Sequence, residues 1–242
     1  MANKATTRDG HAISRSRRPG RAAAAKVKMQ TRGGRARVAG IKGNAAKKLE
    51  KPVPPEVAVL FAMPDSVYKT FPECDVWDEA RDALKYAGNL PVVAHPPCRL
   101  WGKLAHMSTA PESEKELARF AVRQVQRCGG VLEHPLGSRL WDDMGLPAPF
   151  EEDAMGFTGM IPQYLLGHKA EKKTLLYVSG LKKDDLPPAF GLLDLLFTRP
   201  THYVATSRRG LKGVFCTEWE RKATPPKFAR WLVSLAKLCR KL

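Results

Sequence analysis

Two short segments, each directly after an apolar run, carry side chains suited to covalent chemistry. Cys98 ends the segment PVVAHPPC at residues 91–98, and Glu133 lies within GGVLEHP at residues 129–135. A thiolate is a strong nucleophile, and a carboxyl group can protonate or hold a ring nitrogen. Together they suit addition to an electrophilic ring. Ligands of open α/β sheets bind outside the carboxyl ends of strands, so we expect both side chains at one edge of one sheet.

The elements that must position these residues follow from the apolar pattern. Buried strands are predicted at Val57–Ala62, Val92–His95, Val131–Leu132 and Thr174–Ser179. Between the second and third of these, residues 114–128 carry apolar side chains at helical spacing. Ser113 is the predicted N-cap of this helix, with Glu116 completing a capping box, and Gly129 ends it. Strand, helix and strand in this order imply a right-handed parallel unit.

The same pattern gives the expected domain organisation. Residues 136–165 look irregular, with several glycines and prolines, and residues 226–242 form a C-terminal amphipathic helix. We therefore predict an α/β fold with a Rossmann-like, mostly parallel sheet over residues 53–242, preceded by a basic arm at residues 1–52.

Most of the positive charge lies in this arm. The net charge of the 242 residues is +17, and residues 1–50 hold 14 lysines and arginines against only Asp9 and Glu50. They contain no Phe, Trp or Tyr, so they cannot bury enough apolar area to offset the entropy of ordering. We expect a disordered arm that binds DNA or RNA phosphates; a solvated tail and a transit peptide are the alternatives. Its candidate contacts are Arg15, Arg17, Arg18, Arg21, Arg32, Arg35 and Arg37.

Other features restrict the cellular setting. No apolar stretch is long enough for a membrane span, and the five cysteines form no C-x-x-C pair. A disulfide framework and a structural zinc site are both poorly supported. We expect a cytoplasmic protein with DNA as its partner and no membrane.

Four segments of the chain, in order, resemble the DNA cytosine-5 methyltransferase family. Residues 96–98 (PPC) are similar to its Pro-Cys nucleophile segment, and residues 133–135 (EHP) to its Glu-Asn-Val segment. Residues 167–174 resemble its Gly-x-Pro-Gln-x-Arg-x-Arg segment, and residues 223–230 its Leu-Thr-Pro-Arg-Glu-x-Ala-Arg segment. Short members of phage or prophage type are the most similar. The resemblance covers residues 57–242 loosely.

The resemblance implies a methyltransferase sheet and a mechanism. A cytosine is flipped out of the duplex, Cys98 on its Pro97-stiffened loop adds to ring carbon 6, and Glu133 contacts ring nitrogen 3. Carbon 5 then takes a methyl group from S-adenosylmethionine. Lys172 would occupy the place of the family's first arginine, near the base carbonyl. Thr174 stands in the place of the second arginine and cannot perform its role.

The cofactor segment departs from the family. Where the family has a Phe-x-Gly-x-Gly loop, this chain has FAMPDS at residues 61–66, without glycine. Asp75 or Asp78 could bind the ribose hydroxyls of S-adenosylmethionine, and Asp65 and Tyr68 follow the first strand where a cofactor or substrate would lie.

Two aromatic side chains follow the nucleophile and could line the substrate site. Trp101 and His106 could stack on a base, although Trp101 suits a core position equally well.

Several alternatives remain open at this point. Hydroxymethylation and thymidylate-type chemistry begin with the same thiolate addition as methylation. A non-catalytic DNA-binding or packaging protein on a degenerate methyltransferase fold is the leading alternative of another class. A Cys-His hydrolase would use His95 or His134 as its base. A metal site at His95, His106 and His134 is less favoured than ordinary hydrogen bonding, so we predict no metal.

Overall fold

A six-stranded sheet forms the centre of the part of the chain that the computed structural model describes, residues 53–187, 199–204 and 213–239. The strand order is β2-β1-β3-β4-β6-β5, in which β1 to β4 are parallel and β6 is antiparallel to both of its neighbours. The strands are β1 (Val57–Ala62), β2 (Cys74–Asp78), β3 (Val92–Ala94), β4 (Gly130–Pro135), β5 (Gly156–Pro162) and β6 (Lys173–Ser179). The predicted mixed α/β fold with a mostly parallel sheet is confirmed, and it is compatible with a Rossmann-like arrangement.

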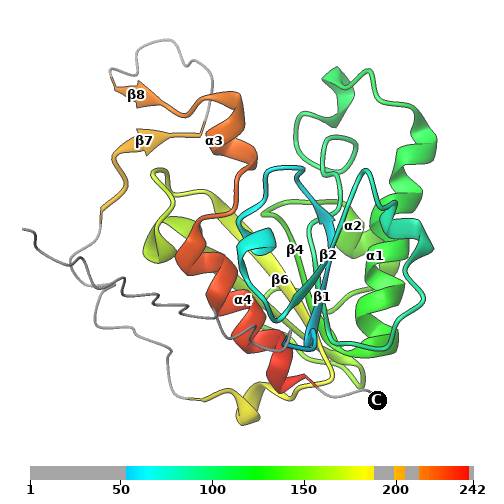
Figure 1. Cartoon of the computed structure of the whole chain (residues 1–242). Coiled ribbons are helices and arrows are strands. Elements are labelled where there is room, and N and C mark those ends of the chain that lie inside the picture. The colour runs from blue at the N-terminus through cyan, green and yellow to red at the C-terminus, as the bar shows by residue number, and fades with distance from the viewer. Residues whose placement is uncertain (1–52, 188–198, 205–212, 240–242) are drawn as a thin grey trace, which may run out of the picture. The chain divides into compact units, whose positions relative to one another are not determined.

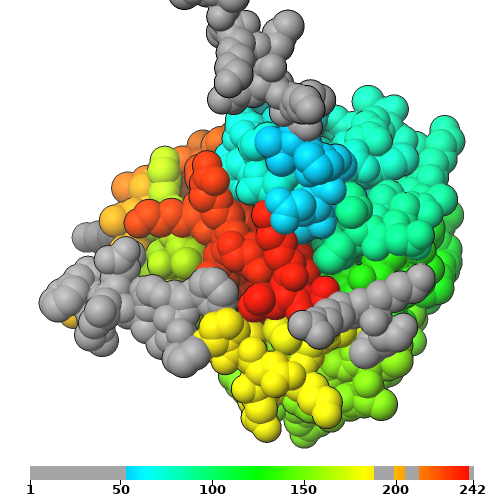
Figure 2. Space-filling view, turned by 60° about the horizontal axis from the view of Figure 1, so that its bottom comes forward, coloured from blue at the N-terminus to red at the C-terminus, as the bar shows by residue number. Residues whose placement is uncertain are grey.

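Helices cover both faces of this sheet (Figure 1). Successive residues of a strand point to opposite faces. Ala58 and Leu60 of β1 therefore pack with helix α1 (Lys115–Cys128), whereas Val57 and Val59 pack with helix α4 (Pro226–Leu238). Figure 2 shows α4, in red, along the middle of its face. All four β1 side chains are fully buried, so each face of the sheet has its own apolar core.

Shorter elements complete the chain. They are α2 (Leu140–Met144), α3 (Glu218–Lys222), the two-stranded sheet of β7 (His202–Tyr203) and β8 (Val214–Phe215), and the 3-10 turns at Val67–Thr70, Ala83–Lys85, Ala105–Met107, Glu112–Glu114, Gln163–Leu166 and Lys183–Asp185. Within the described ranges, every helix is too short or too polar to span a bilayer. The predicted arm at residues 1–52, with its seven candidate arginine contacts, lies outside the described residues.

Two local predictions were wrong. Helix α1 has Glu114 as its N-cap and no side-chain cap, because Ser113 belongs to the 3-10 turn that precedes it. Residues 136–165 are not wholly irregular, since they contain α2 and β5. Gly156 of β5 has a packing reason: a Cβ atom there would lie 2.0 Å from the carbonyl oxygen of Val178 on β6. Gly156, one of the glycines for which residues 136–165 were predicted to be irregular, thus permits close strand pairing.

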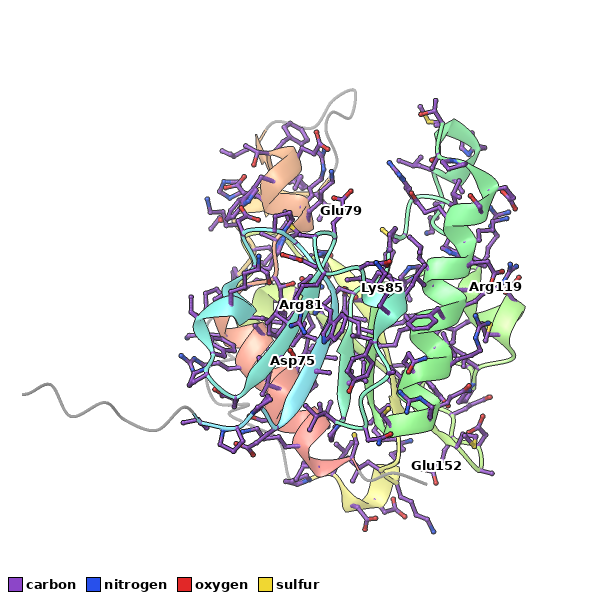
Figure 3. The ribbon with its side chains drawn as sticks, turned by 45° about the vertical axis from the view of Figure 1, so that its right-hand side comes forward. Asp75, Glu79, Arg81, Lys85, Arg119 and Glu152 are labelled. Atoms are coloured by element: carbon purple, nitrogen blue, oxygen red, sulfur yellow. The ribbon has the colours of Figure 1, made fainter. Side chains whose placement is uncertain are left out.

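Strand direction determines which residues meet at the edge of the sheet where β3 and β4 end, hereafter the carboxyl edge. Because β6 runs antiparallel to β4, its first residues lie at this edge, and so do the last residues of β5. Figure 3 shows Glu79, directly after β2, at this end and Glu152, before β5, at the other. The loops after β1, β3, β4 and β5 and the segment before β6 therefore converge.

Candidate active site

Cys98 lies on the loop that follows β3 at the carboxyl edge. Its carbonyl oxygen accepts hydrogen bonds from the backbone N–H groups of Trp101 and Gly102, both at 3.0 Å, which fold the loop into a tight turn. The residue is exposed to solvent. Burial by the surrounding protein nevertheless raises the pKa of the thiol, the charge of Glu133 raises it further, and the charge of Lys172 opposes both. The free protein therefore holds Cys98 as a thiol, next to a carboxylate and an ammonium group.

Glu133 is the residue of β4 on which the polar contacts of this edge converge. Its side chain is 12% exposed. Oε1 accepts a hydrogen bond from Nε2 of Gln163 at 2.9 Å and another from the Thr174 hydroxyl, which also lies 2.9 Å from the His134 carbonyl oxygen. Burial alone would raise the pKa of Glu133, but the charge of Lys172 and the hydrogen bonds from His95 and Thr174 outweigh it and hold that pKa far below its usual range. Glu133 is a buried, ionised carboxylate.

Glu133, His95 and Tyr68 form a hydrogen-bonded row that leads into the core. Nδ1 of His95 lies 3.1 Å from Oε2 of Glu133, and Nε2 of His95 lies 2.9 Å from the hydroxyl oxygen of Tyr68. An ionised carboxylate can only accept, so Nδ1 carries a proton; when the ring is neutral, Nε2 accepts from Tyr68. Tyr68 is fully buried, and burial, together with the charge of Glu133, raises its pKa well above 10. The hydroxyl therefore keeps its proton and fixes the imidazole.

Lys172 links the two reactive groups electrostatically. It precedes β6, and because that strand is antiparallel to β4 the residue lies at the carboxyl edge. Its charge lowers the pKa of both Glu133 and Cys98. Its carbonyl oxygen accepts the backbone N–H of Gln163 at 3.0 Å, which connects the start of β6 to the residue after β5. Lys172 is half-buried.

Sequence reasoning missed Gln163 as part of this site. The residue is 1% exposed, its amide nitrogen is bonded to Glu133, and its Oε1 has no hydrogen-bond partner among the described residues. A buried carbonyl oxygen without a partner is costly. No local signal marks Gln163, because its position depends on the pairing of β5 with β6 and it lies 30 residues beyond Glu133 in the chain.

The aromatic residues predicted beside the substrate are placed differently from each other. Trp101 is 3% exposed and belongs to the core on the α1 side, where Lys115 Nζ and Arg119 Cζ each lie 5.4 Å from its ring centroid. Of the two positions that the sequence left open for Trp101, stacking on a base or packing in the core, the structure shows the core position. His106 is exposed on the loop after Cys98, and Pro97 lies half-buried immediately before the thiol.

The acids predicted to bind the cofactor are already engaged. Asp65 accepts the indole N–H of Trp219 at 2.7 Å. Asp75 is paired with Arg81 at 2.6 Å on the edge strand β2 (Figure 3). Asp78, 7% exposed, accepts from Lys69 at 2.6 Å.

The backbone after β1 is also held by contacts within the chain. Phe61 has a left-handed φ of 60° where the strand register shifts, and Lys69 also bonds the Pro64 carbonyl oxygen at 2.6 Å. These residues therefore do not fit S-adenosylmethionine in the manner of the family.

The geometry gives less support to a Cys-His hydrolase site or a metal site. Both ring nitrogens of His95 are bonded to Tyr68 and Glu133, and Nδ1 of His134 lies 2.7 Å from the Ser138 hydroxyl. A Cys-His hydrolase would need an imidazole hydrogen-bonded to the Cys98 sulfur, and neither ring makes that bond within the described part of the chain. In the same ranges no three His, Cys, Asp or Glu side chains gather as metal ligands.

Comparisons of the chain with models of known protein families, with curated proteins and with solved structures gave no significant match. The function must therefore be inferred from the residues themselves.

Proposed function

We propose that the protein is a nucleic-acid pyrimidine-modifying enzyme of the DNA cytosine-5 methyltransferase type, with Cys98 as nucleophile and Glu133 as the group that engages the ring. The observation that carries this proposal is that the parallel strands β3 and β4 bring an exposed thiol and a carboxylate held by Gln163 and Thr174 to the same edge of the sheet. One lysine, Lys172, acts on both an exposed thiol and a buried carboxylate. The four segments that resemble the family add support. The five free cysteines suit the reducing cytoplasm of a bacterial or phage-infected cell.

The first chemical step balances without a cofactor. Cys98 starts as a thiol, and as a flipped pyrimidine binds, its sulfur forms a bond to ring carbon 6. The carbon 5–carbon 6 π electrons move toward ring nitrogen 3, which takes up a proton. Nitrogen 3 takes up one proton as the thiol releases one to solvent, so the step balances, and the ionised Glu133 carboxylate then accepts a hydrogen bond from the new N3–H group. Lys172 stabilises negative charge that develops on the base carbonyl.

The remaining residues hold Glu133 in place for its contact with the ring. His95, itself fixed by Tyr68, holds Oε2, whereas Gln163 and Thr174 hold Oε1. Three hydrogen bonds on one carboxylate leave little freedom for rotation, so the group is preorganised before the base arrives. After the addition, carbon 5 is nucleophilic toward an activated one-carbon electrophile. The residues after β1 do not fit S-adenosylmethionine, and the addition itself does not require that donor.

Intact-mass spectrometry with duplex DNA containing 5-fluorocytosine tests this proposal. The wild-type chain should gain the mass of the DNA strand, and Cys98→Ser should not. Cys74→Ser is the matched control, because Cys74 lies half-buried on β2 with a pKa raised to about 12, mainly by burial. Reactions with and without S-adenosylmethionine show whether that donor is needed. A folded wild-type protein that binds DNA but forms no adduct in either reaction would contradict the enzymatic proposal.

One observation favours a second candidate, a non-catalytic DNA-binding or packaging protein. The loop after β1 is closed on itself through Lys69, which bonds both Asp78 and the Pro64 carbonyl oxygen. A degenerate sheet without a cofactor site would have such a closed loop after its first strand. The retention of both Cys98 and an ionised Glu133 is evidence against this candidate, since DNA binding needs neither.

A further inference from the structure

A hollow beside the candidate active site has no role in the chemistry described above. Its volume is about 290 Å³, and it is lined by Gly102, Lys103, Ala105, His106, Gly137 and Arg139. Three of these six residues carry cationic or imidazole side chains, and none is acidic. We name this feature the loop hollow.

The loop hollow is built from the two loops that carry the reactive residues. Gly102 closes the turn onto the Cys98 carbonyl oxygen at 3.0 Å, and Gly137 follows β4 a few residues after Glu133. The backbone N–H of Arg139 bonds the Trp101 carbonyl oxygen at 3.0 Å, which ties the two loops together. A ligand in the hollow is therefore held at a fixed place relative to the thiol and the carboxylate.

Two cationic residues of the loop hollow, Lys103 and Arg139, differ from the neighbouring cationic residues, which are paired with carboxylates. Nearby, Arg99 pairs with Glu114, Lys115 with Glu112, and Arg119 with Asp143 and Glu116. Among the described residues, no carboxylate lies within 4.0 Å of Lys103 or Arg139 in this way. Both are exposed, and the Arg139 side chain makes a long hydrogen bond of 3.4 Å to the Leu100 carbonyl oxygen.

One residue that lines the hollow has a backbone conformation that favours glycine. Gly137 has φ +82°, which favours glycine, and a Cβ atom there would come within 3.1 Å of Lys103 Cε. A larger residue would therefore press on the lysine that lines the hollow. Two cationic side chains that face no carboxylate of the described ranges, over a glycine-lined concavity, suit an oxyanion of phosphate size.

We propose that the loop hollow binds a phosphate group of the nucleotide whose base is presented to Cys98. This inference rests on the proposed function and deepens it, because it names the anchor that would hold the substrate beside the thiol. Lys103 and Arg139 neutralise the phosphate, and His106 supplies a further hydrogen-bonding group. The phosphate can belong to a polynucleotide backbone or to a free nucleoside monophosphate.

The salt dependence of DNA binding tests the proposal. Fluorescence anisotropy with the full chain and a labelled duplex should show that the Lys103→Gln/Arg139→Gln variant binds about 10-fold more weakly at moderate salt. The slope of log affinity against log salt should fall by about 1 for each phosphate that the variant no longer neutralises. Lys182→Gln is the control, since Lys182 is exposed and follows β6 at the opposite edge. An unchanged slope in the double variant, together with an unchanged adduct yield on the free nucleoside monophosphate, would overturn the proposal.

Adduct formation separates this inference from the proposed function. The 5-fluorocytosine adduct is measured with duplex DNA and with the free 5-fluorocytosine nucleoside monophosphate. Wild-type adduct with only one substrate identifies the source of the phosphate. If the wild-type adduct forms and the double variant keeps both full yield and full slope, the loop hollow is wrong and the proposed function stands. If no adduct forms but the slope falls, the phosphate site stands and the chemistry is wrong.

Discussion

Nδ1 of His95 lies 3.1 Å from Oε2 of Glu133, although 38 residues separate them in the chain. The opposite ring nitrogen faces Tyr68, a fully buried residue from the turn after β1. The loop after β3 and the turn after β1 thus together orient the Glu133 carboxylate of β4. Because the carboxylate can only accept, the neutral imidazole takes the Nδ1–H tautomer, and Tyr68 then donates to Nε2.

Replacement of Tyr68 by phenylalanine tests this tautomer. Loss of the hydroxyl leaves Nε2 of His95 without its donor, which should cost about 1–3 kcal/mol of unfolding free energy. It should also change the ¹⁵N resonances of the His95 ring and slow adduct formation severalfold. Tyr164→Phe, outside the row, is the control. An unchanged imidazole spectrum in Tyr68→Phe would show that the hydroxyl does not fix the ring.

Replacement of Glu133 by glutamine should abolish adduct formation and destabilise the fold. The amide places an N–H group among three donors, at a cost of about 1–3 kcal/mol. The folded pKa of Glu133 lies below its unfolded value, so its stabilisation is present above the ordinary carboxyl pKa and is lost as pH falls. Urea unfolding should therefore show that the difference between wild type and variant narrows toward pH 4 and below. Glu79→Gln, exposed beyond β2, should show no such difference.

Alkylation should identify Cys98 as the most accessible cysteine. It is exposed, whereas Cys128, Cys216 and Cys239 are buried and Cys74 is half-buried. Burial and Glu133 raise its pKa, so the rate with iodoacetamide should keep rising with pH beyond the range of an ordinary thiol. Lys172→Gln should slow the reaction further at a given pH, because Lys172 lowers that pKa. Lys173→Gln is the adjacent control. Equal rates for the two lysine variants would exclude an effect of Lys172 on the thiol.

His134 should make the fold sensitive to mild acid. Burial lowers its pKa to about 4, although the charge of Glu133 and the Pro97 carbonyl oppose this. Since the unfolded ring takes up its proton near pH 6.5, stability should fall as pH decreases from there toward 4, by about 3 kcal/mol. Urea unfolding of His134→Asn should lack this part of the acid dependence, and His106→Asn, on the surface, should retain it. Parallel curves for wild type and His134→Asn would contradict the assignment.

Deletion of residues 1–50 should weaken DNA binding and flatten its salt dependence. The segment carries most of the net positive charge and no Phe, Trp or Tyr, so its contribution should come from phosphate contacts. Anisotropy titrations at several salt concentrations compare the shortened chain with the full chain. If both give the same slope, the segment does not bind DNA through charge. The 5-fluorocytosine adduct should still form at high DNA concentration.

The sequence alone determined the mostly parallel sheet and the placement of Cys98 and Glu133 toward the carboxyl ends of neighbouring strands. Apolar runs before Cys98 and Glu133, with a helical period between them, are local patterns that require β3, α1 and β4 in that order. The unbroken apolar run Val57–Leu60 likewise indicates a strand that is covered on both faces. Where a pattern was ambiguous, as in the glycine-rich residues 136–165, strand β5 was missed because its identity depends on pairing with β6.

Only the tertiary structure decided which polar groups surround Glu133. Gln163 and Lys172 reach the carboxyl edge because β5 ends there and the antiparallel β6 begins there, a consequence of strand direction that no spacing in the sequence contains. The same holds for Tyr68 and His95, which meet because β1 and β3 are neighbours. Local propensity fixes which segments become strands, whereas long-range backbone hydrogen bonding fixes their order, and that order selects the partners of a buried charge.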